Sequence, residues 1–247
     1  MRKEFMFGVI SLVIIALINI SGAQANDKST KILTSYKKDL TGDDQLEHIQ
    51  IKKNSEGKKN NKIEITISTS TKKTFQIPFT GEKEPKVAFV DYNQDHVTDI
   101  FIMSPNTKGG TPSEFQLFSL INEQLTKIEL PEALTLEAQL ENDYQASIRI
   151  NESGAAYTLD LHDQKKGFDQ KGLYQNGSLN EPAELMVHSF DNLKPVRLKD
   201  MSVGLKGRQP IGEEYDGILI AYVDSTWKWI NGRWELESTE LKKVMNR

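Results

Sequence analysis

The chain has 247 residues, with 31 basic and 35 acidic side chains, no cysteine and 37% hydrophobic residues. The lack of thiols excludes a disulfide-stabilised scaffold and any zinc or iron–sulfur site with cysteine ligands. The net charge of −4 argues against a dedicated nucleic-acid-binding protein, because such proteins need basic surfaces for the phosphate backbone.

The first 25 residues have the pattern of a secretory signal peptide. Arg2 and Lys3 form a positive segment, and an apolar run follows from Phe5 to Ile20. Ala23 and Ala25 supply the small residues of a cleavage site, so we expect cleavage after Ala25 and no membrane span thereafter. The alternative is a permanent anchor, since an apolar run of about 16 residues falls just short of the roughly 20 that cross a bilayer. An exported chain without cysteine is typical of a Gram-positive bacterium.

Apolar residues alternate with polar ones through residues 49–128, the pattern of antiparallel strands with one buried face. We expect hairpins from residues 49–51 with 63–67 and from residues 115–121 with 124–128, and a further strand at 75–79. Val87–Val90 and Ile100–Met103 are continuous apolar runs. Such runs are typical of strands buried on both faces.

Pro131 to Leu140 is the best candidate for a helix, with proline in the first turn and Ala and Glu behind it. It also marks the expected boundary between a repeat region at residues 32–130 and a β-rich region at residues 140–240. In the latter, we expect strands at residues 144–150, 156–162, 185–190, 218–230 and 233–237. Asn176-Gly177 predicts a two-residue hairpin turn inside the polar stretch 165–182.

The C-terminal hairpin can be predicted residue by residue. If Asn231-Gly232 forms a type I′ turn, the facing pairs are Ile230 with Arg233, Trp229 with Trp234, Lys228 with Glu235, and Trp227 with Leu236. Three tryptophans and a leucine then share one face. Such a face is either a sugar-stacking platform or part of the core, and the large gain from burying aromatic rings favours the core.

Two acidic segments carry the strongest chemical signal, because they place oxygen atoms at alternate positions, as calcium loops do. The candidate calcium ligands in the segment 91–99 are Asp91, Asn93, Asp95, Asp99 and the carbonyl of Val97. The corresponding candidates in the segment 39–47 are Asp39, Thr41, Asp43, Gln45 and Glu47. The alternative is that each segment is an ordinary solvated turn. Thr41 is a poorer ligand than Asn93, so Ca²⁺ is the stronger hypothesis for the later segment.

Residues 39–50 and 86–104 resemble the calcium-loop-plus-strand units of FG-GAP and VCBS-type repeats. The C-terminal stretch resembles secreted VCBS-repeat-containing proteins of spore-forming bacilli, through residues 173–177, 216–218, 225–229 and 232–234. The resemblance implies hairpin-built antiparallel sheets in an incomplete propeller-like or stacked arrangement. Asp44 and His96 replace the usual glycine at position 6, but Asp and His are among the residues that best tolerate positive φ. The chain is too short for seven blades.

Catalytic motifs are absent: G-x-S-x-G, H-E-x-x-H, the P-loop and G-x-G-x-x-G do not occur. His162 is flanked by Asp160 and Asp163, which could build a metal or acid–base site, although a strand end followed by a polar turn explains the pattern equally well. Glu213, Glu214 and Asp216 are loose candidates for a pair of hydrolytic carboxylates, because such pairs are set by spatial separation.

The sequence therefore predicts a mainly β, secreted and non-catalytic protein, a calcium-stabilised binding or surface module of the bacterial cell envelope or spore. Its expected partner is a cell-wall polymer or a surface protein. The lysine pairs 52–53, 58–59 and 72–73 could touch an anionic wall polymer, or simply keep hairpin tips and strand edges soluble. The alternative function is a secreted hydrolase acting on cell-wall or extracellular polysaccharide.

Overall fold

A computed structural model describes residues 28–56, 60–79, 83–104, 114–213 and 217–245 of the chain. Strands make up 58% of the structure and all described strand pairs are antiparallel, which confirms the mainly β, antiparallel part of the predicted fold class. The helices among the described residues are the six-residue α1 (Lys165–Gln170) and the 3₁₀ turn η1 (His162–Gln164). None is long and apolar enough to cross a membrane. The predicted signal peptide lies outside the described residues.

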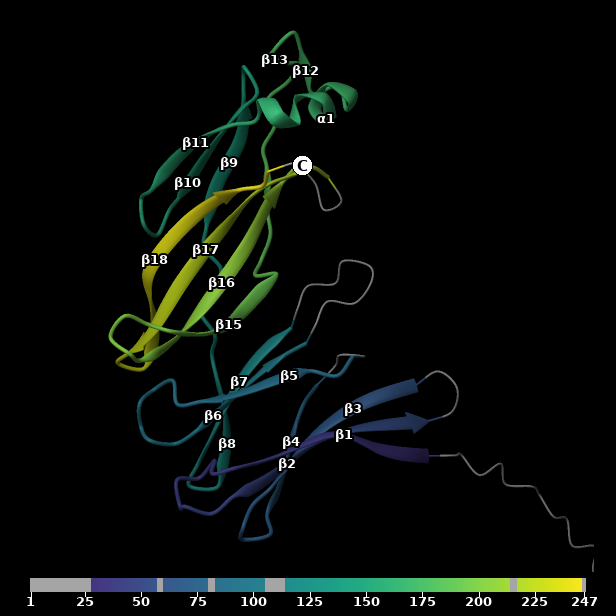
Figure 1. The fold of residues 1–247 in the computed structure, drawn as a ribbon, viewed down its shortest axis with the longest axis vertical. Coiled ribbons are helices and arrows are strands. Elements are labelled where there is room, and N and C mark those ends of the chain that lie inside the picture. The colour runs from purple at the N-terminus through teal and green to yellow at the C-terminus, as the bar shows by residue number, and fades with distance from the viewer. Residues whose placement is uncertain (1–27, 57–59, 80–82, 105–113, 214–216, 246–247) are drawn as a thin grey trace, which may run out of the picture.

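Two four-stranded sheets, in which consecutive strands pair, form the N-terminal half (Figure 1). The first contains β1 (Lys28–Lys38), β2 (Glu47–Glu56), β3 (Asn60–Ser68) and β4 (Thr74–Ile77). The second contains β5 (Lys86–Val90), β6 (Asp99–Met103), β7 (Phe115–Ile121) and β8 (Gln124–Ile128). The predicted hairpins β2–β3 and β7–β8 are confirmed. The unpredicted β1 carries adjacent apolar residues at a bulge beside Ile32, which breaks the alternation.

The second sheet is a middle layer with a core on each side. Ile100 and Ile102 of β6 pack in the core of the first sheet, whereas Phe101 between them packs in the core of the C-terminal half. Because successive side chains of a strand point to opposite faces, β6 is buried on both faces, as predicted. Val87–Val90 also packs against both cores, but it is only half-buried because β5 is an edge strand.

The C-terminal half contains three further sheets. The largest has the order β14 (Met186–Val187), β16 (Val203–Gly212), β17 (Leu219–Ile230), β18 (Arg233–Lys243), with β15 (Asn192–Arg197) also on β16. The second has the order β11 (Ala156–Asp160), β10 (Gln145–Ile150), β9 (Leu136–Glu141). The third is the hairpin of β12 (Tyr174–Gln175) and β13 (Ser178–Leu179). Its turn is Asn176-Gly177 with φ of 53° and 86°, as predicted.

The predicted helix at Pro131–Leu140 was wrong. Residues 129–135 have no regular secondary structure, and β9 begins at Leu136. The buried Gln209 explains this, because its Oε1 accepts the Leu134 N–H at 2.8 Å and its Nε2 donates to the Leu134 carbonyl at 3.0 Å. The side-chain amide holds this backbone extended, so a tertiary contact overrides the local helix propensity.

The central strand β16 was not predicted, because three glycines and Pro210 interrupt its pattern. A side chain would clash most severely at two of these glycines. A Cβ on Gly204 would lie 2.2 Å from the Trp227 carbonyl oxygen, and one on Gly207 would lie 2.3 Å from the Phe190 ring. Their absent side chains let neighbouring groups approach the strand closely.

The C-terminal hairpin has the predicted turn and the predicted register. Asn231 and Gly232 have φ of 51° and 83°, and the four facing pairs named above occur as expected. Lys228 faces Glu235 as predicted, and its ammonium forms an ion pair with Asp200.

Candidate functional site

The two acidic segments occupy the same place in the two N-terminal sheets. The first loop, residues 39–47, joins β1 to β2, and the second loop, residues 91–99, joins β5 to β6. The loops also approach each other, since a Cβ built on Gly42 would lie 3.3 Å from Cγ2 of Val97. The structure therefore brings the two sets of predicted ligands to one region of the molecule.

The first-position aspartate bridges each loop in the same way. Oδ2 of Asp39 accepts the N–H of Asp44 at 2.9 Å, and Oδ2 of Asp91 accepts the N–H of His96 at 3.0 Å. Asp44 and His96 have φ of 61° and 69°, so the expectation that these residues tolerate positive φ in place of glycine is confirmed. The fourth position also has positive φ in both loops, 74° at Gly42 and 61° at Gln94.

The acid at the ninth position of each loop accepts a hydrogen bond from the backbone N–H of the second position. Oε2 of Glu47 accepts the N–H of Leu40 at 2.6 Å, and Oδ2 of Asp99 accepts the N–H of Tyr92 at 3.0 Å. Both acids have an exposed fraction of 0%. The two loops thus share one backbone frame, although they agree in sequence only at the aspartates of positions 1 and 5.

Each loop leaves buried side-chain oxygens without a hydrogen-bond partner. In the second loop these are Oδ1 of Asp91 and Oδ1 of Asp99, and in the first loop they are Oγ1 of Thr41 and Oε1 of Glu47. A buried acceptor without a partner is costly. Four of the ten predicted ligands are therefore oxygens that a cation could satisfy.

The environment of Asp99 disfavours its negative charge. Burial raises the pKa of this carboxyl to about 6, and the charges of Asp95 and Asp91 act in the same direction. The hydrogen bond from the Tyr92 amide opposes the increase most strongly, and the Ser119 hydroxyl acts in the same sense although it does not reach hydrogen-bond geometry. A cation at the second loop would favour the ionised form by the same Coulombic rule.

The remaining predicted ligands bond within their own loops. Asn93 donates from Nδ2 to Oδ2 of Asp95 at 2.8 Å, and Oδ1 of Asp95 accepts the Val97 N–H at 2.8 Å. Oδ1 of Asp43 likewise accepts the N–H of Gln45 at 2.9 Å. Within the described part of the chain, no three His, Cys, Asp or Glu side chains are grouped so that they could hold a metal. Calcium at these loops therefore stays a prediction.

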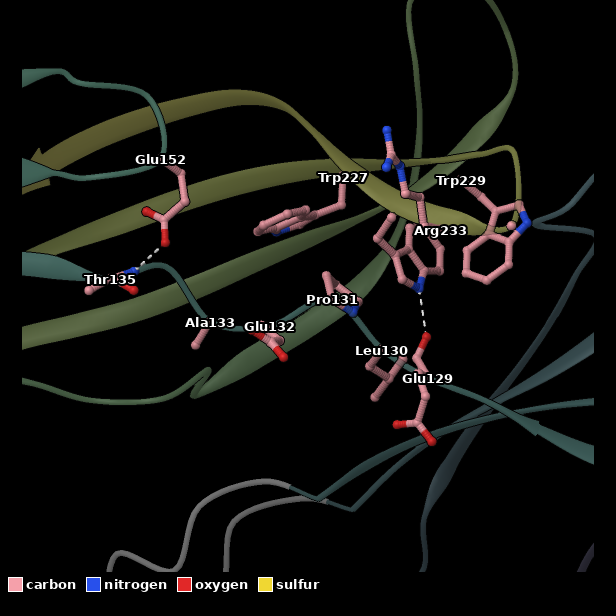
Figure 2. A pocket seen from close by; sticks show the side chains of 12 residues that line it. Glu129, Leu130, Pro131, Glu132, Ala133, Thr135, Glu152, Trp227, Trp229 and Arg233 are labelled. Atoms are coloured by element: carbon pink, nitrogen blue, oxygen red, sulfur yellow. Dashed lines mark hydrogen bonds between the residues drawn. The ribbon is translucent and has the colours of Figure 1, made fainter.

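A groove of about 400 Å³ lies between the tip of the β17–β18 hairpin and the segment 129–135 (Figure 2). Trp227, Trp229 and Trp234 line it. Trp227 is 8% exposed and donates from Nε1 to Oγ of Ser225 at 2.8 Å, so its predicted core role is confirmed. Trp229 and Trp234 are only half-buried, so the predicted core role holds for them only in part. Their ring centroids lie 5.2 Å apart at 73°.

The opposite wall of this groove was not predicted. It includes Glu129, Glu132 and Glu152, and the Glu129 carbonyl accepts the Nε1–H of Trp234 at 2.8 Å. These residues precede the tryptophans by many positions, and no local motif marks them. Only the extended path of residues 129–135 brings them to the hairpin.

The histidine cluster considered for catalysis is an exposed surface contact. Nδ1 of His162 lies 2.7 Å from Oδ1 of Asp160, and Nε2 lies 3.6 Å from Oδ1 of Asp143. Asp163 bonds instead to Lys243 at 2.5 Å. Of the loosely proposed hydrolytic acids, Glu213 pairs with Lys171 at 2.6 Å, and residues 214 and 216 lie outside the described residues.

The C-terminal strands correspond to a known family model. Residues 134–242 match the YybI C-terminal domain. The matched stretch begins just before β9 and ends one residue before the end of β18. It includes all three tryptophans but neither acidic loop. No curated protein and no solved structure matches the chain. The comparisons do not link it to FG-GAP or VCBS repeats, so that resemblance remains a hypothesis.

Proposed function

We propose that the chain is a secreted, non-catalytic binding or surface module of the bacterial cell envelope or spore, stabilised by calcium at its two acidic loops. The proposal of calcium rests on the shared structure of the two loops. Both have the same hydrogen-bonded frame, and in each a fully buried acid, Glu47 or Asp99, has one oxygen without a hydrogen-bond partner. A buried carboxylate without a counter-charge is destabilising, and a bound cation offsets that cost.

The oxygen chemistry of the second loop fits calcium better than other common metals. Asp91 and Asp99 offer free carboxylate oxygens, and the chain has no thiol. Calcium takes six to eight oxygen ligands in flexible geometry, including carbonyls and waters. Asn93 and Asp95 would exchange their mutual hydrogen bond for the ion. The matching position of the two loops in two four-stranded sheets supports the proposed relation to FG-GAP and VCBS units.

Calcium should raise the thermal unfolding midpoint, because an ion bound only by the folded state adds RT ln(1 + [L]/Kd) to stability. With dissociation constants of about 10⁻⁴ to 10⁻³ M, about 1 mM calcium adds roughly 0.4 to 1.4 kcal/mol per filled site. Asp91→Ala should remove more of this gain than Asp39→Ala, because the second loop offers two free acidic oxygens and the first offers one. Calorimetry in calcium and in chelator measures both differences.

The matched control for this experiment is Glu181→Ala, at an exposed position away from both loops, which should keep the full calcium shift. Asp99→Asn tests whether the buried charge at this position destabilises the protein when calcium is absent. It keeps an acceptor for the Tyr92 N–H while removing the buried charge, so it should stabilise the protein in chelator and reduce its response to calcium. Equal midpoints of the unmutated protein in calcium and in chelator would remove calcium from the proposal.

The secreted form should begin at Asn26, because the positive segment, apolar run and Ala23-x-Ala25 pattern direct export and cleavage. Intact-mass measurement of protein from the culture medium and from washed cell walls tests this start and the envelope location together. Recovery only in the membrane pellet, with residues 1–25 attached, would replace the secreted module by an anchored protein.

A further inference from the structure

The tryptophan-lined groove has the features of a ligand site. It contains all three tryptophans of the chain, and its volume of about 400 Å³ is within the usual range of small-molecule pockets. Trp227 contributes a buried indole, while Trp229 and Trp234 remain half-buried. Figure 2 shows Trp227 and Trp229 on either side of Arg233, with Pro131 on the Trp227 side.

The charge of the groove indicates which kind of ligand it favours. Glu129, Glu132 and Glu152 line it, and all three are exposed. Among the residues that the structure describes, Arg233 is the one basic side chain that lines the groove, and its guanidinium already bonds to Oε1 of Glu235 at 3.0 and 2.8 Å. The groove is therefore net negative. It repels an anionic polymer and attracts a cation.

We propose that this groove binds an organic cation, a quaternary or protonated alkylammonium group. Aromatic faces attract such cations through the ring quadrupole, and Trp is the strongest of the three aromatic residues in this role. The glutamates add Coulombic attraction that a neutral sugar would not use. The proposal names the ligand site of the binding module proposed above and depends on that role, but not on calcium.

Three contacts hold the groove in shape without a ligand. Trp234 is fixed by its hydrogen bond to the Glu129 carbonyl and by its edge-on contact with Trp229. On the other wall, Oε1 of Glu152 accepts the Thr135 N–H at 2.8 Å. A ligand would thus enter a largely pre-formed site, which lowers the ordering cost of binding.

Choline and its neutral isostere 3,3-dimethylbutan-1-ol provide the direct test, because they share a shape and differ in charge. Each is titrated into the full secreted chain at constant ionic strength while the three indole N–H signals are followed by NMR. We expect choline to bind about tenfold more tightly than the isostere. Since every indole lines the groove, these signals report directly on this site.

Variants connect the result to the named residues. Glu132→Gln removes one groove charge without changing its size and should weaken choline binding several-fold, whereas the control Glu181→Gln should leave it unchanged. Trp229→Ala should weaken it further. A cooperative melting transition near the midpoint of the unmutated protein, measured in chelator, would show that each variant is folded. Because this control needs no calcium, it separates failure of this site from failure of the calcium proposal.

Three outcomes would overturn the cation site. Equal affinity for choline and the isostere would show apolar binding only. Binding of a neutral glycan such as chitobiose, without binding of choline, would identify a carbohydrate groove instead. No perturbation of the indole signals by either probe would leave the tryptophans with a structural role alone.

Discussion

Gly204→Ala is expected to destabilise the protein by about 3 kcal/mol or more, at the upper end of the range for overpacking. The added Cβ would lie 2.2 Å from the carbonyl oxygen of Trp227 and within 3.1 Å of the Leu198 side chain. The Trp227 carbonyl cannot move aside easily, because Leu205 on β16 is paired with Trp227 on β17. Relief of the clash would require the central ladder of the sheet to separate.

Urea unfolding of the variant measures this loss, and Gly154→Ala is the matched control. Gly154 has φ of +69° and nothing within 4 Å of an added Cβ, so its replacement costs only the left-handed backbone penalty of roughly 1–2 kcal/mol. If the Gly204 variant lost no more stability than this control, the close approach of the Trp227 carbonyl to Gly204 would be contradicted.

Phe101→Ala is expected to cost about 3 to 5 kcal/mol, the usual loss for a fully buried phenylalanine. Phe101 is 2% exposed, and its ring lies 6.4 Å from that of Tyr92 and 6.3 Å from that of Phe115. It is the fully buried side chain that β6 contributes to the core of the C-terminal half, where Met103 adds a partly buried one. The cavity would therefore open between the middle sheet and its C-terminal neighbours.

Phe75→Ala is the comparison for this second experiment, because Phe75 is half-buried on the edge strand β4 and should lose clearly less stability. The tryptophan emission adds a readout specific to the interface. Tyr92 contacts both Phe101 and, at 5.8 Å, the ring of Trp234, so the Phe101 variant should alter the emission of the native protein. Equal losses for the two variants would contradict the two-sided burial of β6.

The parts of the fold that were predicted are those encoded by neighbouring residues. Asn231-Gly232 requires two left-handed positions in succession, and a two-residue turn fixes the register of the strands on both sides. The hairpin β7–β8 was found in the same way, although its turn, Asn122-Glu123, reaches positive φ without glycine. The left-handed geometry at Asp44 and His96 was likewise foreseeable from residue type alone.

The parts that were missed depend on distant residues. Gln209 holds Leu134 extended from 75 positions away, and nothing near Pro131 in the sequence signals it. The glycines of β16 are required by Trp227 and Phe190, which a strand pattern does not reveal. For the candidate site, the positions of the acids were predictable, but the complete burial of Asp99 and Glu47 was not, since it follows from the packing of two sheets.

Tyr92 lies outside the matched stretch, residues 134–242, but its ring packs against Trp234 inside it. This contact limits how the stretch can be used in other proteins. Its core is completed by Phe101 and Leu117 of the middle sheet, which lie outside the matched residues. A chain that carries this stretch without the two N-terminal sheets would expose an apolar surface around Trp234. Such a chain would need another layer of structure to cover that surface. The stretch can therefore fold in another protein only if that protein supplies an equivalent packing partner.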